Sequence, residues 1–407
     1  MIKGFTHVTI ALAMSIGAAA CARGVDAPPV TFQTGIVGTA PAGTPSPMAT
    51  MNDAAVRSLI LQLTKRPLAA GEAAKILSTA PYDIAAVVGA GLARRDGDTL
   101  HLAVSFLSAD DQKLIAIRSR GYGRELADLV LARRTEIESA VETLAATEAE
   151  RRALLFFLVG CLALDWEGLE YTQQAGYRAA ATVTGPGFSY TPWMKENAPD
   201  LSRRGLYWGS HNRAAGDHTF TTFGDHDALP RRALPDLLFA NAASSGSAGV
   251  DLADASRVLQ AIDAGARSLD RIAEMAALTD ARLATTVTFL ETIGYVGRGD
   301  AGYTHHIVLV RGDARPAVAK VVGLVRDQVS VWHERRASEL RRELATLTAL
   351  GQGVPFEVLY TDIWHYVFGF ANLFLAEGGL ITDPYADTWR FRGFVPVLWA
   401  NQIREPS

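Results

Sequence analysis

Cysteine is nearly absent from this chain of 407 residues, which contains only Cys21 and Cys161. Two thiols cannot build a disulfide framework or a four-thiolate zinc site, so both classes are excluded. Long apolar runs are also missing from the body of the chain. The longest run, Ala153–Leu164, has about 12 residues, whereas crossing a bilayer takes about 20, so it predicts a buried helix.

An excess of charge of either sign is lacking as well. The net charge is −4, charged residues make up 20% of the chain and apolar residues 49%. This balance is typical of soluble globular proteins and does not indicate nucleic-acid binding through bulk charge. Nucleophile elbows, phosphate loops and paired catalytic carboxylates are absent in any interpretable context, so the sequence favours a protein that is not an enzyme.

The N-terminus has the pattern of an export signal at residues 1–20. One lysine precedes an uncharged stretch, Val8–Ala20, that is too short for a stable transmembrane helix. The end of this stretch, Gly17-Ala-Ala-Ala-Cys21, resembles the signal of bacterial lipoproteins. The resemblance implies lipidation of Cys21, a cell-envelope location and the membrane as a partner through the lipid anchor. Ala18 stands where such signals usually carry leucine, so plain secretion stays an alternative.

Residues 21–52 are rich in proline, glycine, alanine and threonine and show neither a helical nor a strand period. Such a segment buries too little surface to order itself, so we expect a flexible tether between the lipid and the folded body. The alternative is a true start at Met48 or Met51, which would give a cytoplasmic protein without a leader.

The body of the chain contains an internal repeat. Residues 55–176 align with residues 255–379 at a shift of about 202, by the order of their elements rather than by identity. We therefore expect two units of one fold after the tether, at 53–181 and 249–407, with a Gly/Pro/His-rich insertion at 182–248. The second unit is expected to end in C-terminal strands.

The second copy has the clearest local pattern. Apolar residues recur at helical spacing in three segments, Ala255–Ala264, Leu269–Ala276 and Asp280–Ile293. Two alternating segments, Tyr295–Arg298 and Tyr303–Val310, then predict a two-stranded ribbon. Three helices and a ribbon in this order resemble the winged helix-turn-helix superfamily, in the style of the MarR and ArsR regulators.

The resemblance covers Ala255–Val310 and Ala55–Phe106 and rests on pattern rather than on a diagnostic motif. In this superfamily the third helix enters the major groove of DNA. The corresponding helix of the first copy, Pro81–Ala93, has no donor for a base or a phosphate and is expected to pack. The second copy offers a thin DNA footprint: Arg267, Arg271, Arg282, Thr285, Thr286 and Arg298. Four acidic residues on the same elements would repel phosphate, so DNA binding is only an alternative.

Long helices of mixed charge are predicted after each ribbon, at about 110–144 and 314–350. Their charges favour a solvated face stabilised by pairs four residues apart. The alternative is a partner-binding face, for an unknown protein, for a second copy in a homodimer, or for the other repeat in an intramolecular pseudo-dimer.

The insertion concentrates histidine and aspartate, which are ligands of first-row metals. The candidate ligands of a divalent metal are His211, Asp217, His218, Asp225, His226 and Asp227. Their spacing matches no helical histidine pair, so we favour a surface hairpin with a strand at Thr219–Phe223 over a metal site. No cofactor is otherwise expected.

The sequence thus predicts an α+β, mainly helical protein of two tandem winged-helix-like units, each followed by long helices. The favoured function is protein binding or scaffolding by an envelope-anchored lipoprotein. The alternatives are a cytoplasmic winged-helix DNA-binding transcriptional regulator and a metal-dependent enzyme that uses the His/Asp-rich loop.

Overall fold

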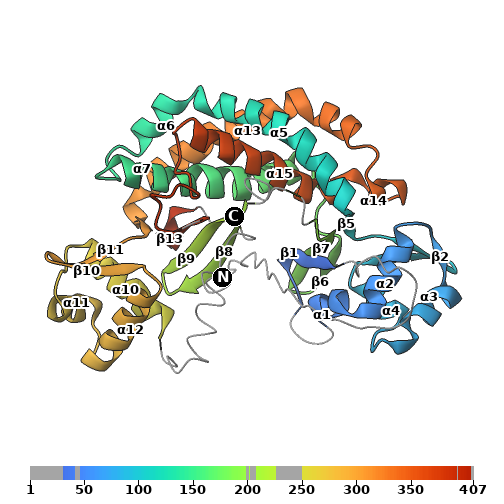
Figure 1. Cartoon of the computed structure of the whole chain (residues 1–407), viewed down its shortest axis with the longest axis horizontal. Coiled ribbons are helices and arrows are strands. Elements are labelled where there is room, and N and C mark those ends of the chain that lie inside the picture. Colours follow the sequence, from blue (N-terminus) through green and yellow to red (C-terminus); the bar gives the residue numbers. More distant parts are fainter. Residues whose placement is uncertain are drawn as a thin grey trace. The chain divides into compact units, whose positions relative to one another are not determined.

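The structure, a computed structural model, describes residues 31–41, 46–198, 201, 208–225, 250–391 and 393–404 (Figure 1). Helices predominate and the strands form several separate sheets, so the α+β, mainly helical class is confirmed. Within the described ranges, no helix combines the length and apolarity needed to cross a membrane. The chain divides into two compact units: unit 1 takes residues 1–122, 169–202 and 333–367, and unit 2 takes 123–168, 203–332 and 368–407.

Unit 1 contains a module of three helices and a small sheet. Its elements are α2 (Ala54–Leu63), β2 (Leu68–Ala69), α3 (Ala70–Ile76), η1 (Leu77–Thr79), α4 (Ile84–Gly89), β3 (Ala93–Asp96) and β4 (Thr99–Leu102). The Asp53 carboxylate caps α2 by accepting hydrogen bonds from the N–H groups of Ala55 and Val56. Val56 and Leu59 are buried at helical spacing, as the sequence predicts.

A second sheet of unit 1 is built around β7 (Phe188–Glu196). This strand pairs antiparallel with β1 (Phe32–Thr39) and β6 (Val183–Gly185), and parallel with β5 (Ser105–Leu107). Gly38 lets the backbones approach, because a Cβ atom there would lie 2.2 Å from the Ser189 carbonyl oxygen.

The flexible tether predicted for residues 21–52 is therefore wrong for its described part. Phe32–Thr39 is strand β1 and Pro47–Asn52 is helix α1. Pairing with β7 satisfies the backbone of β1, and Phe32 and Ile36 are buried. This strand could not be predicted from the sequence, because glycine and threonine interrupt the alternation of apolar residues in it.

Unit 2 contains the corresponding three-helix module. Its elements are α10 (Leu252–Asp263), α11 (Leu269–Ala276), α12 (Asp280–Thr292), β10 (Val296–Gly299) and β11 (Gly302–His305). Ser268 caps α11 by accepting a hydrogen bond from the N–H of Arg271. Gly294 ends the segment after α12 with φ 77°. The predicted strand Tyr303–Val310 breaks at residues 306–307, because β11 pairs with β10 whereas the following β12 joins another sheet.

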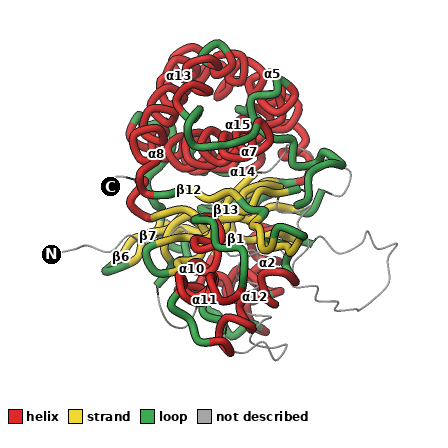
Figure 2. The backbone as a smooth tube through the Cα atoms, turned by 90° about the vertical axis from the view of Figure 1, so that its left-hand side faces the viewer, coloured by secondary structure: helices red, strands yellow, loops and turns green. Residues whose placement is uncertain are grey.

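The large sheet of unit 2 has the strand order β12 (Val308–Val310), β13 (Phe394–Ala400), β9 (His218–Asp225) and β8 (Trp208–Ala215). In unit 2 this sheet lies between helices α10–α12 and helix α7 (Figures 1 and 2). The predicted insertion at 182–248 is thus not one element in its described part, since β6 and β7 belong to the sheet of unit 1 and β8 and β9 to that of unit 2.

The remaining helices follow the modules in chain order. They are α5 (Ala109–Leu131), α6 (Arg134–Ala140), α7 (Glu148–Leu155), the π-helical segment η2 (Phe156–Glu167), α8 (Gly168–Gln174), η4 (Gly312–Ala314), α13 (Arg315–Glu343), α14 (Thr348–Gly351), α15 (Phe356–Glu377) and η5 (Asn401–Ile403). The apolar run Ala153–Leu164 is buried throughout, as predicted.

The two copies share one pattern of strand pairing. In each copy, the strand after the module (β5 or β12) pairs in parallel with the last strand (β7 or β13). That last strand pairs antiparallel with a strand that precedes the module (β1 or β9). The repeat therefore begins earlier in the chain than the sequence indicated, and β9 is the counterpart of β1.

Helices are exchanged between the copies. The α7–η2 segment of the first copy belongs to unit 2, where the Phe156 ring lies 5.2 Å from the ring of Phe223 in β9. The first half of α15, from the second copy, belongs to unit 1, where Asp362 bonds to Ser105 of β5. Each unit thus takes part of its core from the other copy.

Candidate functional site

The structure does not bring together the predicted metal ligands that it describes, His211, Asp217 and His218. His211 is buried in β8, His218 begins β9, and Asp217 is exposed at the turn between them. His211 pairs with Thr222 and His218 with Ala215, so the two rings are four positions apart along the hairpin, about 13 Å. Among the described residues, no group of three potential ligands converges. His226, Asp227 and the side chain of Asp225 lie outside the described residues.

The predicted strand Thr219–Phe223 is confirmed as part of β9, but its predicted place on a surface hairpin is wrong. The hairpin turns at Gly216 and Asp217, and β9 is an inner strand of the sheet. Thr221 and Thr222 are fully buried. The sequence could not indicate this, because the partner strand β13 is remote in the chain.

The arginines of the predicted DNA footprint have partners inside unit 2. The Arg282 guanidinium donates to Asp254, a buried carboxylate, at 2.8 Å. Arg267 donates to the carbonyl oxygens of Ile262 and Ala266 at the end of α10.

The other footprint residues are also engaged. Arg271 pairs with Glu274, and the Arg298 guanidinium lies 5.6 Å from the centre of the Tyr303 ring. The hydroxyls of Thr285 and Thr286 donate to the helix carbonyls of Ala281 and Arg282. Each of these side chains therefore has a partner within unit 2.

Unit 1 contains a buried polar cluster that was not predicted from the sequence. The Nζ atom of Lys195 lies 2.8 Å from Asp362 Oδ1, and both side chains are 5% exposed. The Ser105 hydroxyl donates to Asp362 Oδ2 at 2.6 Å. A serine, an acid and an amine could perform proton transfer, but this cluster is closed to solvent and therefore holds β5, β7 and α15 together.

The thiol of Cys161 is equally inaccessible. It lies in η2, and burial raises its pKa well above the ordinary value. A protonated, buried thiol is a poor nucleophile, so this residue is part of the core of unit 2.

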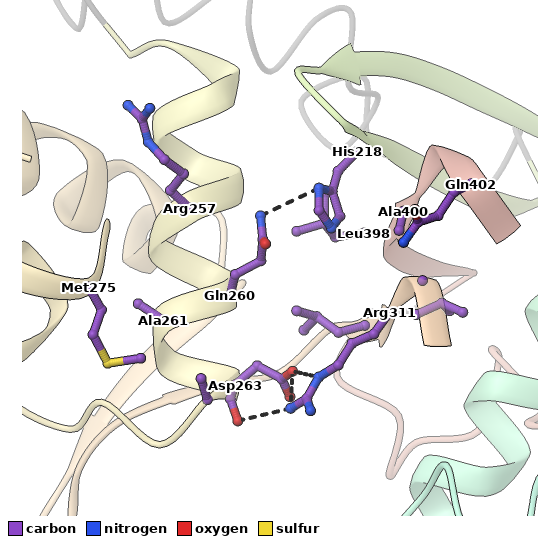
Figure 3. Close-up of a pocket in the computed structure, with 14 residues that line it drawn as sticks. His218, Arg257, Gln260, Ala261, Asp263, Met275, Arg311, Leu398, Ala400 and Gln402 are labelled. Atoms are coloured by element: carbon purple, nitrogen blue, oxygen red, sulfur yellow. Dashed lines mark hydrogen bonds and ion pairs between the residues drawn. The ribbon is translucent and has the colours of Figure 1, made fainter. Parts of the chain in front are cut away.

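An open pocket of about 510 Å³ lies in unit 2 between α10 and the end of the large sheet (Figure 3). Gln260 of α10 approaches His218 of β9, with 3.5 Å between the amide nitrogen and Nδ1. Below them, the Arg311 guanidinium donates from Nε to Asp263 Oδ2 at 2.6 Å. Gln402 of η5 lies on the opposite side of the pocket from α10.

Residues at the two ends of α10 fix where Gln260 and Asp263 lie. Asp251 caps the start of α10, and the helix ends after Asp263 because Gly265 adopts a positive φ of 98°. Asp263 therefore stands at the helix end, where it binds both Arg311 and the His305 ring, whose Nε2 is 3.3 Å from Oδ1.

The electrostatics of the pocket follow from these contacts. Burial lowers the pKa of His218 from its ordinary value, against the opposing charge of Asp217. Burial by itself would raise the pKa of Asp263, but hydrogen bonds from His305 and Arg311 bring it below the ordinary value. At neutral pH we therefore expect a neutral imidazole and an ionised, already paired carboxylate.

The described lining combines hydrogen-bonding side chains with aliphatic ones. Among the described residues around the pocket, none is a serine, threonine, cysteine, lysine or tyrosine. The polar groups are amides, guanidiniums, an imidazole and the Asp263 carboxylate beside alanine and leucine side chains, a mixture typical of ligand sites.

Sequence reasoning singled out one residue of this site, His218, and assigned it to a metal. It missed Gln260, Arg311 and Gln402, which come from three separate segments. A weak signal existed in Gln260, a polar residue at the boundary of the apolar face of α10. Comparisons of the chain with protein-family models, curated proteins and solved structures gave no match.

Proposed function

We propose that this chain is a non-enzymatic binding protein of the bacterial envelope, anchored through a lipid on Cys21, with a ligand site in unit 2. Its two three-helix modules are winged-helix-like scaffolds. The observation that carries the binding function is the open pocket, which has hydrogen-bonding groups and apolar walls but no nucleophile in its described lining.

The envelope location is supported by the leader pattern that ends at Cys21. DNA regulation is disfavoured because Arg282 and Arg267 bind groups of their own unit. Metabolic labelling with palmitate, combined with fractionation, tests the location by comparing wild type with Cys21→Ala. Labelled wild type in the membrane fraction and unlabelled variant outside it are expected. An unlabelled cytosolic wild type that binds duplex DNA in a salt-dependent manner would reverse the proposal.

The ligand site is tested by thermal unfolding of the full chain against a library of small polar compounds. A ligand that binds the native state raises the melting temperature, and the rise grows with concentration. Ala264→Trp, which fills the pocket from an exposed lining position, should abolish the rise, whereas Ala281→Trp on α12, outside the lining, should retain it. Equal shifts in both variants would place binding elsewhere.

A further inference from the structure

The lining of the unit 2 pocket is rich in hydrogen-bond donors. The one carboxylate in its described lining, Asp263, has both oxygens engaged, Oδ1 by His305 at 3.3 Å and Oδ2 by Arg311 at 2.6 Å. Arg311 uses Nε and one terminal nitrogen in this pair. Its other terminal nitrogen forms no hydrogen bond or ion pair with a described residue, so it can donate to a ligand. Its side chain is 60% exposed.

Gln402 and His218 add to this donor set. The Gln402 amide lies against the backbone of Gly312, next to Arg311. In the tautomer whose Nδ1 accepts from Gln260, His218 carries its proton on Nε2 and can donate it. Guanidinium, amide and imidazole N–H groups together suit a carboxylate head group.

The remaining wall is aliphatic. Leu309, Leu398 and Ala261 line the pocket, and Met275 stands at its edge, 39% exposed. No Phe, Tyr or Trp ring lines it among the described residues. A ligand that fills the space therefore carries an aliphatic body rather than a flat ring.

The first copy has larger side chains at the corresponding place. By strand register, His218 and Leu309 correspond to Phe32 and Phe106, which are buried in unit 1 with ring centres 6.4 Å apart. Smaller side chains in unit 2 thus leave space that aromatic rings fill in unit 1.

The charge changes in the same direction. Ala400, which pairs with His218, corresponds to Glu196, which pairs with Phe32. Unit 2 therefore lacks a carboxylate at this position, next to the donors of the pocket. The difference in volume leaves room for a ligand, and the difference in charge favours an anion.

From these observations we propose that the unit 2 pocket binds a small aliphatic carboxylate, with its head at Arg311, Gln402 and His218 and its body along Leu309 and Leu398. This rests on the proposed function, because it names the ligand of the same site. The ligand is held without reaction, since no covalent step is implied.

The test is isothermal titration of the full chain with linear carboxylates from butanoate to octanoate, beside the alcohols and alkylammonium ions of the same length. Binding is expected for a carboxylate and not for its alcohol or ammonium analogue. Gln402→Glu, at an exposed side chain, should weaken carboxylate binding by about tenfold or more through charge repulsion, and Gln402→Ala should weaken it less.

Leu309→Phe, which introduces the first-copy residue, should abolish binding, and Phe106→Leu in unit 1 is its matched control that should retain it. Equal or tighter binding of the ammonium ion, or a Gln402→Glu variant that binds as well as wild type, would overturn the carboxylate assignment. If other compounds still raise the melting temperature and lose this effect in Ala264→Trp, the proposed function stands without the carboxylate. If no carboxylate and no other compound binds, both fail.

Discussion

Lys195 of β7 and Asp362 of α15 form a buried ion pair, 2.8 Å between Nζ and Oδ1, that joins a strand of the first copy to a helix of the second. Removing one partner of such a pair leaves an unpaired charge in the core. Asp362→Ala should therefore lower the free energy of unfolding by about 3–5 kcal/mol, measured by urea denaturation.

A double variant tests whether the instability of Asp362→Ala comes from the unpaired charge that it leaves behind. Lys195→Met with Asp362→Leu removes both charges together and should recover most of the loss. Arg66→Ala, which breaks the exposed pair with Glu72, is the control and should leave the urea midpoint nearly unchanged. A double variant as unstable as Asp362→Ala would contradict this role.

Because the α7–η2 segment packs in unit 2, a substitution in it should destabilise the sheet of unit 2 rather than the sheet of its own copy. Phe156 belongs to the first copy but packs on Phe223 in the sheet of unit 2. Phe156→Ala should cost about 3–5 kcal/mol and accelerate amide hydrogen exchange in β9 and β13, while β1 and β7 stay protected. Mass spectrometry of exchanged peptides measures this directly. Faster exchange confined to β1 and β7 would show that the helix covers its own copy.

Strand β1 can be tested at Gly38. Gly38→Ala would place a Cβ atom against the Ser189 carbonyl, whereas Gly97→Ala, also at positive φ, meets open space. Both variants should lose about 1–2 kcal/mol of stability, because alanine is strained in a left-handed backbone. Only Gly38→Ala should also separate β1 from β7, which hydrogen exchange would detect as faster exchange of the β1 amides. If the two variants behave alike, the pairing of β1 with β7 is refuted.

A buried histidine gives the fold a dependence on pH. Burial lowers the pKa of His365 to about 4, opposed by its hydrogen bond with the Thr361 carbonyl. The unfolded chain, with a histidine pKa of about 6.5, binds the proton first, so stability is complete above that pH and is lost as pH falls towards 4. The urea midpoint of wild type should fall over this window, and that of His365→Gln should fall less. Parallel curves would exclude His365 as the cause.

The sequence predicted those parts of the fold that local pattern determines. The periodic apolar residues of α10, such as Val258 and Ile262, report burial on one face of a single helix. Strand β1 could not be recognised in this way, because it becomes ordered only through β7, which is remote in the chain. The exchange of α7–η2 and α15 could not be predicted either, because an apolar helix sequence does not indicate which of two sheets the helix covers.

The candidate site was the least predictable part. Its polar residues come from three separate elements: His218 from β9, Arg311 from the N-cap of η4, and Gln402 from η5. None of them belongs to a recognisable sequence motif. The two copies must be compared to find the site, because Leu309 of unit 2 occupies the position that is equivalent to Phe106 of unit 1. The smaller side chain leaves space in unit 2 that the ring fills in unit 1.

Native mass spectrometry of the full chain with octanoate tests the ligand site most directly. We expect one bound molecule on the wild-type protein and on Phe106→Leu, and none on Leu309→Phe. The same octanoate adduct on wild type and Leu309→Phe, or no adduct on either, would contradict it.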